Sequence, residues 1–157
     1  MISLQGTRFG EIEVEEGSEI VFARGLFGFP DARRYVLLYP GGRGKVAWLQ
    51  SLEVAGLAFP VVDGAALGPD YPQPSPVHLA TEAGLGTGEL ALLVIVAAQK
   101  GRGLVANMLA PLLVDMETRT GAQIVLDAQT YSAAAPLRPA AAPSPHVQAQ
   151  SMLAEAR

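Results

Sequence analysis

The two histidines are the first residues to consider for catalysis or metal binding, and they lie far apart in the chain. His78 falls in a short predicted helix, and His146 lies near the C-terminus. A catalytic or metal-bound imidazole needs a partner that holds its ring, and neither histidine has one nearby in sequence. There is no cysteine, which excludes a thiolate nucleophile, a cysteine-based metal site and a disulfide framework. We therefore interpret both histidines as solvent-facing and expect no metal site.

Two glycine-rich segments invite comparison with nucleotide-binding loops. In the segment Gly41–Lys45, Val46 stands where a phosphate loop needs Ser or Thr, and Tyr39 occupies the first glycine position. The segment Gly84–Gly88 precedes a predicted strand, whereas dinucleotide-binding glycines follow a strand and open a helix. We interpret the first as a hairpin turn and the second as a helix exit, and we expect no catalytic residues and no cofactor.

An acidic cluster near the N-terminus is the most marked charge feature. Because side chains alternate along a strand, Glu11, Glu13 and Glu15 would share one face. Such a face could attract a basic partner and speed its encounter. It could equally be a solvated face that discourages aggregation at a sheet edge. The sequence leaves both interpretations open.

Two further positions are typical of contact loops. Asp70 and Tyr71 lie between Pro69 and Pro72, and the prolines stiffen the loop, so little entropy is lost when it binds. Tyr71 is therefore either a contact residue or a side chain that folds back over the core. Asn107 could contact a partner, but hydrogen bonding to a neighbouring turn is the better interpretation.

The elements that position these residues are predicted to be short strands. Glycine and proline are frequent, at 17 and 12 residues, and they separate short runs of β-branched, aliphatic and aromatic residues. Ser75 and Pro76 predict the start of a short helix that ends before Gly84. Strands are predicted over residues 12–15, 19–24, 34–39, 46–51, 57–62, 89–98, 104–109, 112–116 and 123–126.

The predicted fold class is all-β: a compact, antiparallel, β-barrel-like single domain with one short helix. The domain is expected to cover residues 1–132, and the Ala/Pro-rich residues 133–157 are expected to form a flexible C-terminal tail. A closed barrel and a sandwich would both protect the edges of so many short strands. The pattern does not separate them.

Charge and hydropathy limit the partners and the compartment. The formal net charge of -4 argues against direct binding of nucleic acid or an anionic membrane. The N-terminus has no signal-peptide pattern, and the apolar run from Leu90 to Ala98 is far shorter than the roughly 20 residues that a spanning helix needs. We predict a cytoplasmic protein, monomeric in isolation, with no membrane contact.

The order of several motifs resembles the flagellar assembly factor FliW family over about residues 2–132. Each motif is weak alone, but six in this order are hard to produce by chance. The segment Gly64–Gly68 lacks a proline of the family pattern, and the tail is longer than in the family. The motifs are Phe9–Val14, Gly25–Phe29 with Arg34–Leu38, Trp48–Leu52 with Leu57–Phe59, Pro69–Tyr71, Ala106–Pro111 and Gln123–Leu126.

The resemblance implies a β-barrel-like protein that binds other proteins and is not an enzyme. FliW-like proteins bind flagellin in the cytoplasm before export, and they bind the basic, RNA-binding translational regulator CsrA. The two partners compete, so that flagellin synthesis follows secretion. On this hypothesis the Glu11–Glu19 cluster supplies charge against CsrA, and Asp70, Tyr71, Phe27 and Phe29 supply contacts.

Two alternatives stay open. A small β-barrel of this size could bind flavin or another nucleotide, although basic residues are few. The chain could also be a flagellin chaperone without a CsrA contact, and its own sequence does not decide this.

Overall fold

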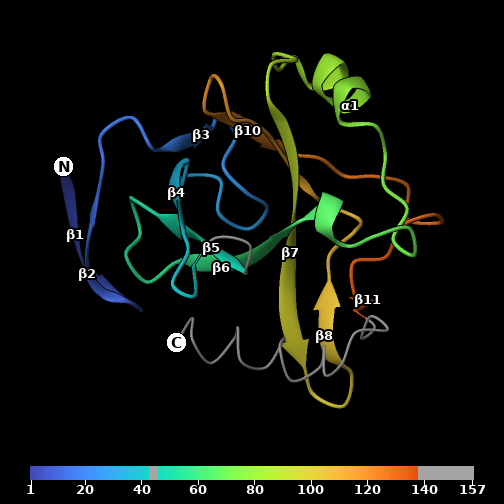
Figure 1. Ribbon diagram of the computed structural model, residues 1–157, viewed down its shortest axis with the longest axis horizontal. Coiled ribbons are helices and arrows are strands. Elements are labelled where there is room, and N and C mark those ends of the chain that lie inside the picture. The colour runs from blue at the N-terminus through green and yellow to red at the C-terminus, as the bar shows by residue number, and fades with distance from the viewer. Residues whose placement is uncertain (43–45, 138–157) are drawn as a thin grey trace.

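A computed structural model of the chain describes residues 1–42 and 46–137 (Figure 1). Residues Arg43, Gly44 and Lys45 of the predicted turn segment, and the predicted tail from residue 138 with His146, lie outside the described residues. The strands are β1 Ile2–Thr7, β2 Gly10–Val14, β3 Ile20–Phe22, β4 Arg34–Leu38, β5 Ala47–Ser51, β6 Ala58–Asp63, β7 Leu90–Gln99, β8 Gly103–Ala106, β9 Leu112–Asp115, β10 Thr120–Gln123 and β11 Ala135–Pro136. The helices are the 3-10 turn Gly64–Ala66 and α1 Pro76–Ala83.

The strands form a closed barrel, and β7 is the strand that closes it. The hydrogen-bonded order β7-β6-β5-β4-β3-β10-β9 returns to β7, because β7 pairs with β6 and also with β9. Its last residues, from Val96 to Gln99, extend beyond the barrel as a ribbon with β8. The sequence left a barrel and a sandwich open, and the closed ring decides for the barrel.

The closure uses one parallel contact. Among the residues that the structure describes, every strand pairing is antiparallel except β3 with β10, where Val21 pairs with Thr120 and Phe22 with Gly121. The connection between these two strands spans most of the chain. The predicted antiparallel pairing therefore holds for every described strand pair except β3–β10, which we call the parallel seam.

Three apolar clusters meet on β7. Leu93 contributes to the barrel interior, Leu92 to a cluster under α1, and Val94 and Val96 to a cluster under β8 and β11. Both faces of β7 are therefore covered, as its continuous apolar pattern predicted. The barrel interior holds Ile20, Phe22, Leu26, Ala32, Tyr35, Ala47, Leu49, Val61, Leu93, Leu112 and Val114.

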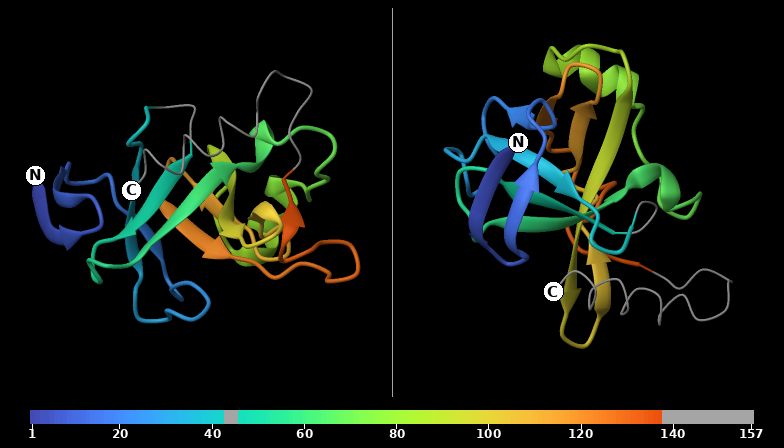
Figure 2. Two further views of the ribbon diagram at one scale, coloured as in Figure 1. Left: turned by 90° about the horizontal axis from the view of Figure 1, so that it is seen from below. Right: turned by 60° about the vertical axis from the view of Figure 1, so that its left-hand side comes forward.

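The hairpin β1–β2 is a separate two-stranded sheet at one end of the molecule (Figures 1 and 2). Its turn rests on the barrel, since the ring of Phe9 meets Trp48 edge-on at 5.5 Å between centroids. The guanidinium of Arg8 lies 4.1 Å from the centre of the same indole ring. These contacts fix the face of β2 that carries the acidic residues.

The predicted helix is confirmed with its caps. The Ser75 side chain accepts a hydrogen bond from the His78 N–H, and Gly84 ends the helix in the left-handed region with φ 74°. The His78 side chain is 71% exposed and pairs with Glu82 at 3.3 Å. The solvent-facing interpretation of His78 is therefore correct.

Several strands differ from the predicted elements only in their bounds, such as β8 at Gly103–Ala106 against the predicted 104–109, and three differences go further. The strand expected at 123–126 is β10 at Thr120–Gln123; beyond it, Ile124 and Leu126 still donate backbone hydrogen bonds to Pro111 and Leu109, but irregularly. β1 was not predicted, although its residues Ile2 to Gln5 alternate between half-buried and exposed. A tail was expected from residue 133, yet Ala135–Pro136 pairs with β8, since Ala135 and Leu137 pack against the cluster that contains Val96.

Candidate functional site

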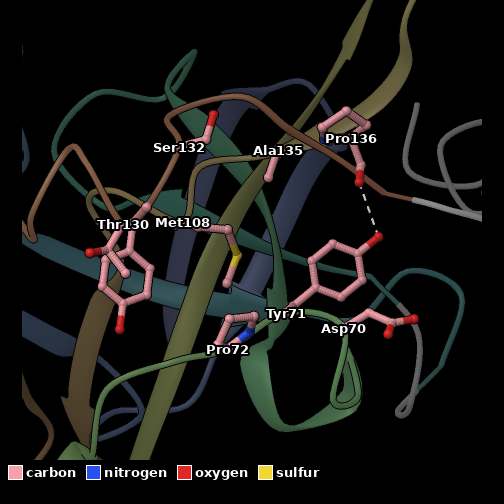
Figure 3. Close-up of a pocket in the computed structure, with 9 residues that line it drawn as sticks. Asp70, Tyr71, Pro72, Met108, Thr130, Ser132, Ala135 and Pro136 are labelled. Atoms are coloured by element: carbon pink, nitrogen blue, oxygen red, sulfur yellow. Dashed lines mark hydrogen bonds between the residues drawn. The ribbon is translucent and has the colours of Figure 1, made fainter.

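The predicted loop residues Asp70 and Tyr71 line an open pocket of about 320 Å³ next to β8 and β11 (Figure 3). The loop that follows the 3-10 turn supplies one wall, and residues 130–136 supply another. Met108 lies at its floor and is 6% exposed. The lining is Asp70, Tyr71, Pro72, Met108, Thr130, Tyr131, Ser132, Ala135 and Pro136.

Tyr71 takes one of the two roles that the sequence left open, that of a side chain folded over the core, and its role as a contact residue stays a prediction. Its ring packs against the cluster of Val94, Val96, Ala106 and Met108, so it covers part of the core. Its hydroxyl donates a hydrogen bond to the carbonyl of Pro136 at 3.0 Å, which Figure 3 shows as a dashed line. The ring also remains part of the pocket wall, while Asp70 beside it is exposed.

Phe27 lines a second, larger groove of about 530 Å³, between the loop after β3 and the exit of α1. Phe27 is 56% exposed and Val125, which also lines the groove, is 62% exposed. Leu79, Leu85 and the aliphatic part of the β10 exit complete an apolar wall, with Arg24 and Glu82 as the charged residues. Large side chains exposed in a groove are typical of a protein-contact surface.

Gln123 holds the loop that carries Phe27. Its Oε1 accepts a hydrogen bond from the Phe27 N–H at 2.8 Å, and its Nε2 donates to the Ala110 carbonyl at 3.1 Å. One amide therefore connects the loop after β3 to the segment before β9. Sequence reasoning missed this residue, because Gln123 is separated from Phe27 by 96 positions.

Phe29 belongs to the same loop but faces the barrel. Its ring meets Phe59 at 5.7 Å between centroids, in an edge-to-face arrangement, and 41% of the side chain remains exposed. Gly25 sits at φ 66°, and a Cβ there would collide with the Phe29 carbonyl oxygen, so only glycine fits this turn. The two aromatic side chains of this loop therefore have different environments: Phe27 lines the groove, and Phe29 packs against Phe59.

The acidic residues lie on the outer face of the β1–β2 hairpin. Glu11 and Glu13 are exposed on β2, and Glu15 is exposed just beyond its end, while Ile12 and Val14 turn to the other face. The Ser3 hydroxyl donates to a Glu11 carboxylate oxygen at 3.3 Å. The predicted shared face is thus present on β2. It lies at the opposite end of the molecule from β8 and β11 (Figures 1 and 2).

Asn107 has a structural role. Its Oδ1 accepts a hydrogen bond from the Ala110 N–H at 3.1 Å, which closes the turn between β8 and β9. The Asn107 backbone N–H donates to the Ile95 carbonyl at 2.8 Å and ends the ribbon with β7. The turn-bonding interpretation describes these contacts, and nothing in the structure brings Asn107 into either pocket lining.

The glycine segment after α1 faces carboxylates. A Cβ on Gly86 would lie 2.6 Å from Asp115 Oδ2, and one on Gly88 would collide with the Glu117 carboxylate. A phosphate at this segment would meet two negative groups, which opposes nucleotide binding there. Within residues 1–42 and 46–137, no group of His, Asp and Glu is arranged to hold a metal ion. No helix of this part of the chain is long and apolar enough to span a membrane.

Comparison with known proteins gives one consistent result. The family model described as FliW protein matches residues 3–137. A protein named flagellar assembly factor FliW from Natranaerobius thermophilus is 37% identical over 141 residues, covering 87% of this chain and 92% of that protein. One of the same name from Bdellovibrio bacteriovorus is 33% identical over 132 residues, covering 76% and 70%. A crystal structure of the flagellar assembly factor FliW superposes with a TM-score of 0.73 at 25% identity, covering 87% of this chain and 97% of that one.

Proposed function

Because the chain belongs to the FliW family, we propose that it is a flagellar assembly factor that binds flagellin and antagonises the translational regulator CsrA. The observation that carries this proposal is the extent of the family match. Residues 3–137 include the hairpin, the barrel and β11, and therefore every surface described above. The protein acts by binding other proteins in the cytoplasm and performs no reaction.

The acidic hairpin face suits a basic partner. Glu11 and Glu13 point outward from β2 next to Ser3, and Glu15 and Glu16 continue the negative charge beyond the strand. A basic RNA-binding protein docked here would be attracted by complementary charge. The same carboxylates would repel an RNA phosphate backbone, so RNA and this chain would exclude each other on that protein.

The exposed aromatic groove suits an apolar partner segment. Phe27 and Val125 both line the groove, and each residue is more than half exposed. Flagellin would bind here or at the Asp70–Tyr71 pocket through such contacts. The hairpin and that pocket lie at opposite ends of the molecule. If CsrA binds the hairpin and flagellin binds the pocket, they can compete directly only if at least one of them extends beyond its own surface.

The first experiment mixes the purified chain with the host's flagellin and with its CsrA, followed by size-exclusion chromatography and titration calorimetry. The proposal predicts a complex with each partner and displacement of CsrA by flagellin. Binding of flagellin alone would reduce the function to a chaperone without regulation. Binding of neither would contradict the proposal.

A matched pair of variants tests the groove. Phe27→Ala should weaken flagellin binding by about tenfold or more, as loss of a central aromatic contact does. Val54→Ala is the control, because Val54 is 49% exposed and lines neither pocket. Equal affinities for the two variants would exclude the groove as the flagellin surface.

A further inference from the structure

The open edge of β8 is covered by the chain's own segment Ala134–Leu137. Ala135 pairs with Ala106 and Pro136 with Val105, and the Leu137 N–H donates to the Leu104 carbonyl at 2.9 Å. The named strand β11 is only two residues long. The cover is therefore a short strand on an edge that could pair with any extended chain.

Two side chains hold this segment through its backbone alone. Tyr71 donates to the Pro136 carbonyl at 3.0 Å, and Arg102 Nη2 donates to the Ala134 carbonyl at 3.0 Å. Neither contact involves a side chain of the segment, so neither depends on the identity of its residues. Another peptide in the same extended conformation would offer the same two acceptors.

The side chains of the segment alternate as in any half-buried strand. Ala135 and Leu137 face the cluster that contains Val96 and Met108, and Pro136 faces outward and is exposed. The groove therefore accepts a small residue, then a residue of any type, then an aliphatic residue. Selection by side chain is weak and apolar, and it involves no charged group of the bound segment.

The segment can leave without disturbing what precedes it. The Ser132 carbonyl accepts hydrogen bonds from both Met108 and Leu109, at 2.9 and 3.1 Å, and so fixes the chain just before the segment. The Ala134 N–H bonds locally, to Ser132 Oγ at 3.1 Å. Ser132 is thus a fixed point about which residues 133–137 can turn.

We propose that the β8 edge is a strand-exchange site, where an extended segment of a protein partner, with a small residue and an aliphatic residue two positions apart, displaces Ala134–Leu137. Exchange is favoured over addition of a further strand. The outer edge of β11 presents Pro136, which has no N–H, and its carbonyl is already bonded to Tyr71. This mode of recognition is β-strand addition in which the chain's own segment Ala134–Leu137 competes with the partner for the β8 edge. It goes beyond the binding of flagellin and CsrA proposed above and does not depend on either.

A labelled peptide with the sequence of residues 132–139 tests the site on the full chain by fluorescence anisotropy. In the unaltered chain the tethered segment competes at an effective concentration in the millimolar range, so the peptide should bind weakly. Leu137→Asp weakens the tethered strand and should raise peptide affinity by about tenfold or more. Val54→Asp is the control, because it introduces the same charge at a residue that is 49% exposed and lines neither pocket, and its affinity should match the unaltered chain. A Leu137→Asp chain that binds no better than the control would overturn the proposal.

Hydrogen exchange provides a test without substitution. The Leu137 amide should exchange at least about a hundredfold faster than the Asn107 amide, which bonds to Ile95, because the segment opens locally while the ribbon stays closed. Equal protection of the two amides would mean that the segment opens only when the barrel unfolds, and this would refute strand exchange. Both tests use this chain and its own peptide, so their failure leaves the proposed function untouched.

Discussion

Gly121 of β10 lies directly against the ring of Phe22 of β3, where the parallel pairing closes the barrel. A Cβ on Gly121 would stand 2.6 Å from Cε2 of Phe22 and 3.1 Å from the Leu113 carbonyl oxygen. Phe22 is fully buried and its ring meets Tyr35 edge-on at 5.6 Å. The seam therefore depends on a glycine for space and not for backbone conformation, since Gly121 has no positive φ.

Gly121→Ala should destabilise the fold by about 1–3 kcal/mol, because an added methyl overpacks a seam between a buried ring and backbone. Gly56→Ala is the matched control. No atom lies within 4 Å of a Cβ at Gly56 and its φ is not positive. Urea unfolding of both variants measures the difference, and equal midpoints would mean that the seam can widen at little cost.

Tyr35→Phe should retain or increase stability at neutral pH, by up to about 1 kcal/mol. The Tyr35 hydroxyl is buried, and no described protein group lies within hydrogen-bonding distance of it. Replacing an unpaired buried hydroxyl by hydrogen removes its desolvation cost. Urea unfolding at pH 7 tests this, and a loss above about 1 kcal/mol would show that the hydroxyl has a bound partner.

The same variant should change the response to alkaline pH. Burial, with a smaller contribution from the Glu53 carboxylate, raises the pKa of Tyr35 from 10.0 to about 12. Between these values the unfolded chain releases the proton and the folded chain keeps it, so the free energy of unfolding falls as pH rises. Tyr35→Phe should lose less stability than the unaltered chain between pH 10 and pH 11. Parallel losses would assign the alkaline sensitivity to other groups.

Phe9→Ala should release the β1–β2 hairpin from the barrel. The edge-to-face contact between Phe9 and Trp48 contributes about 0.5–1.5 kcal/mol beyond the buried area. Trp48 is the only tryptophan of the sequence and is 4% exposed, so its fluorescence reports docking. The emission should shift to the red, while Ser3→Ala on the outer face of the same hairpin should leave it unchanged. An unshifted spectrum would mean that the hairpin stays docked without Phe9.

The parts of the fold that local pattern predicts are those whose pairing is also local. The helix at Pro76–Ala83 follows from its caps, and the central strand β7 follows from its apolar run. The parallel seam joins residues about a hundred positions apart and leaves no local signal. Sequence pattern did not reveal β11, because its residues lie in an Ala/Pro-rich segment whose pairing depends on the shape of the groove beside β8.

The candidate surfaces likewise combine features that local sequence pattern predicts with contacts between distant segments that it does not. Alternation along β2 predicts the acidic face, and the two prolines predict a fixed Tyr71 loop. The sequence could not reveal that Tyr71 bonds to Pro136, because the hydroxyl reaches across 65 positions. Nor could it reveal Gln123 as the anchor of Phe27, since a single amide in a strand resembles any polar strand residue. Side-chain contacts between distant segments become visible only in the folded structure.

Combined reversal of Glu13→Lys and Glu15→Lys should weaken CsrA binding if the hairpin face meets that basic protein. Charge attraction between exposed groups is screened by salt, with a Debye length of about 10 Å at 0.1 M, so the loss should be largest at low ionic strength. The control reverses Glu89 and Glu117, which are also exposed and change the net charge equally, but lie just before β7 and in the β9–β10 turn. Titration calorimetry at two salt concentrations should give a salt-dependent loss only for the hairpin variant. Equal losses for both variants would assign the effect to net charge, and unchanged affinity at low salt would exclude this face from the CsrA contact.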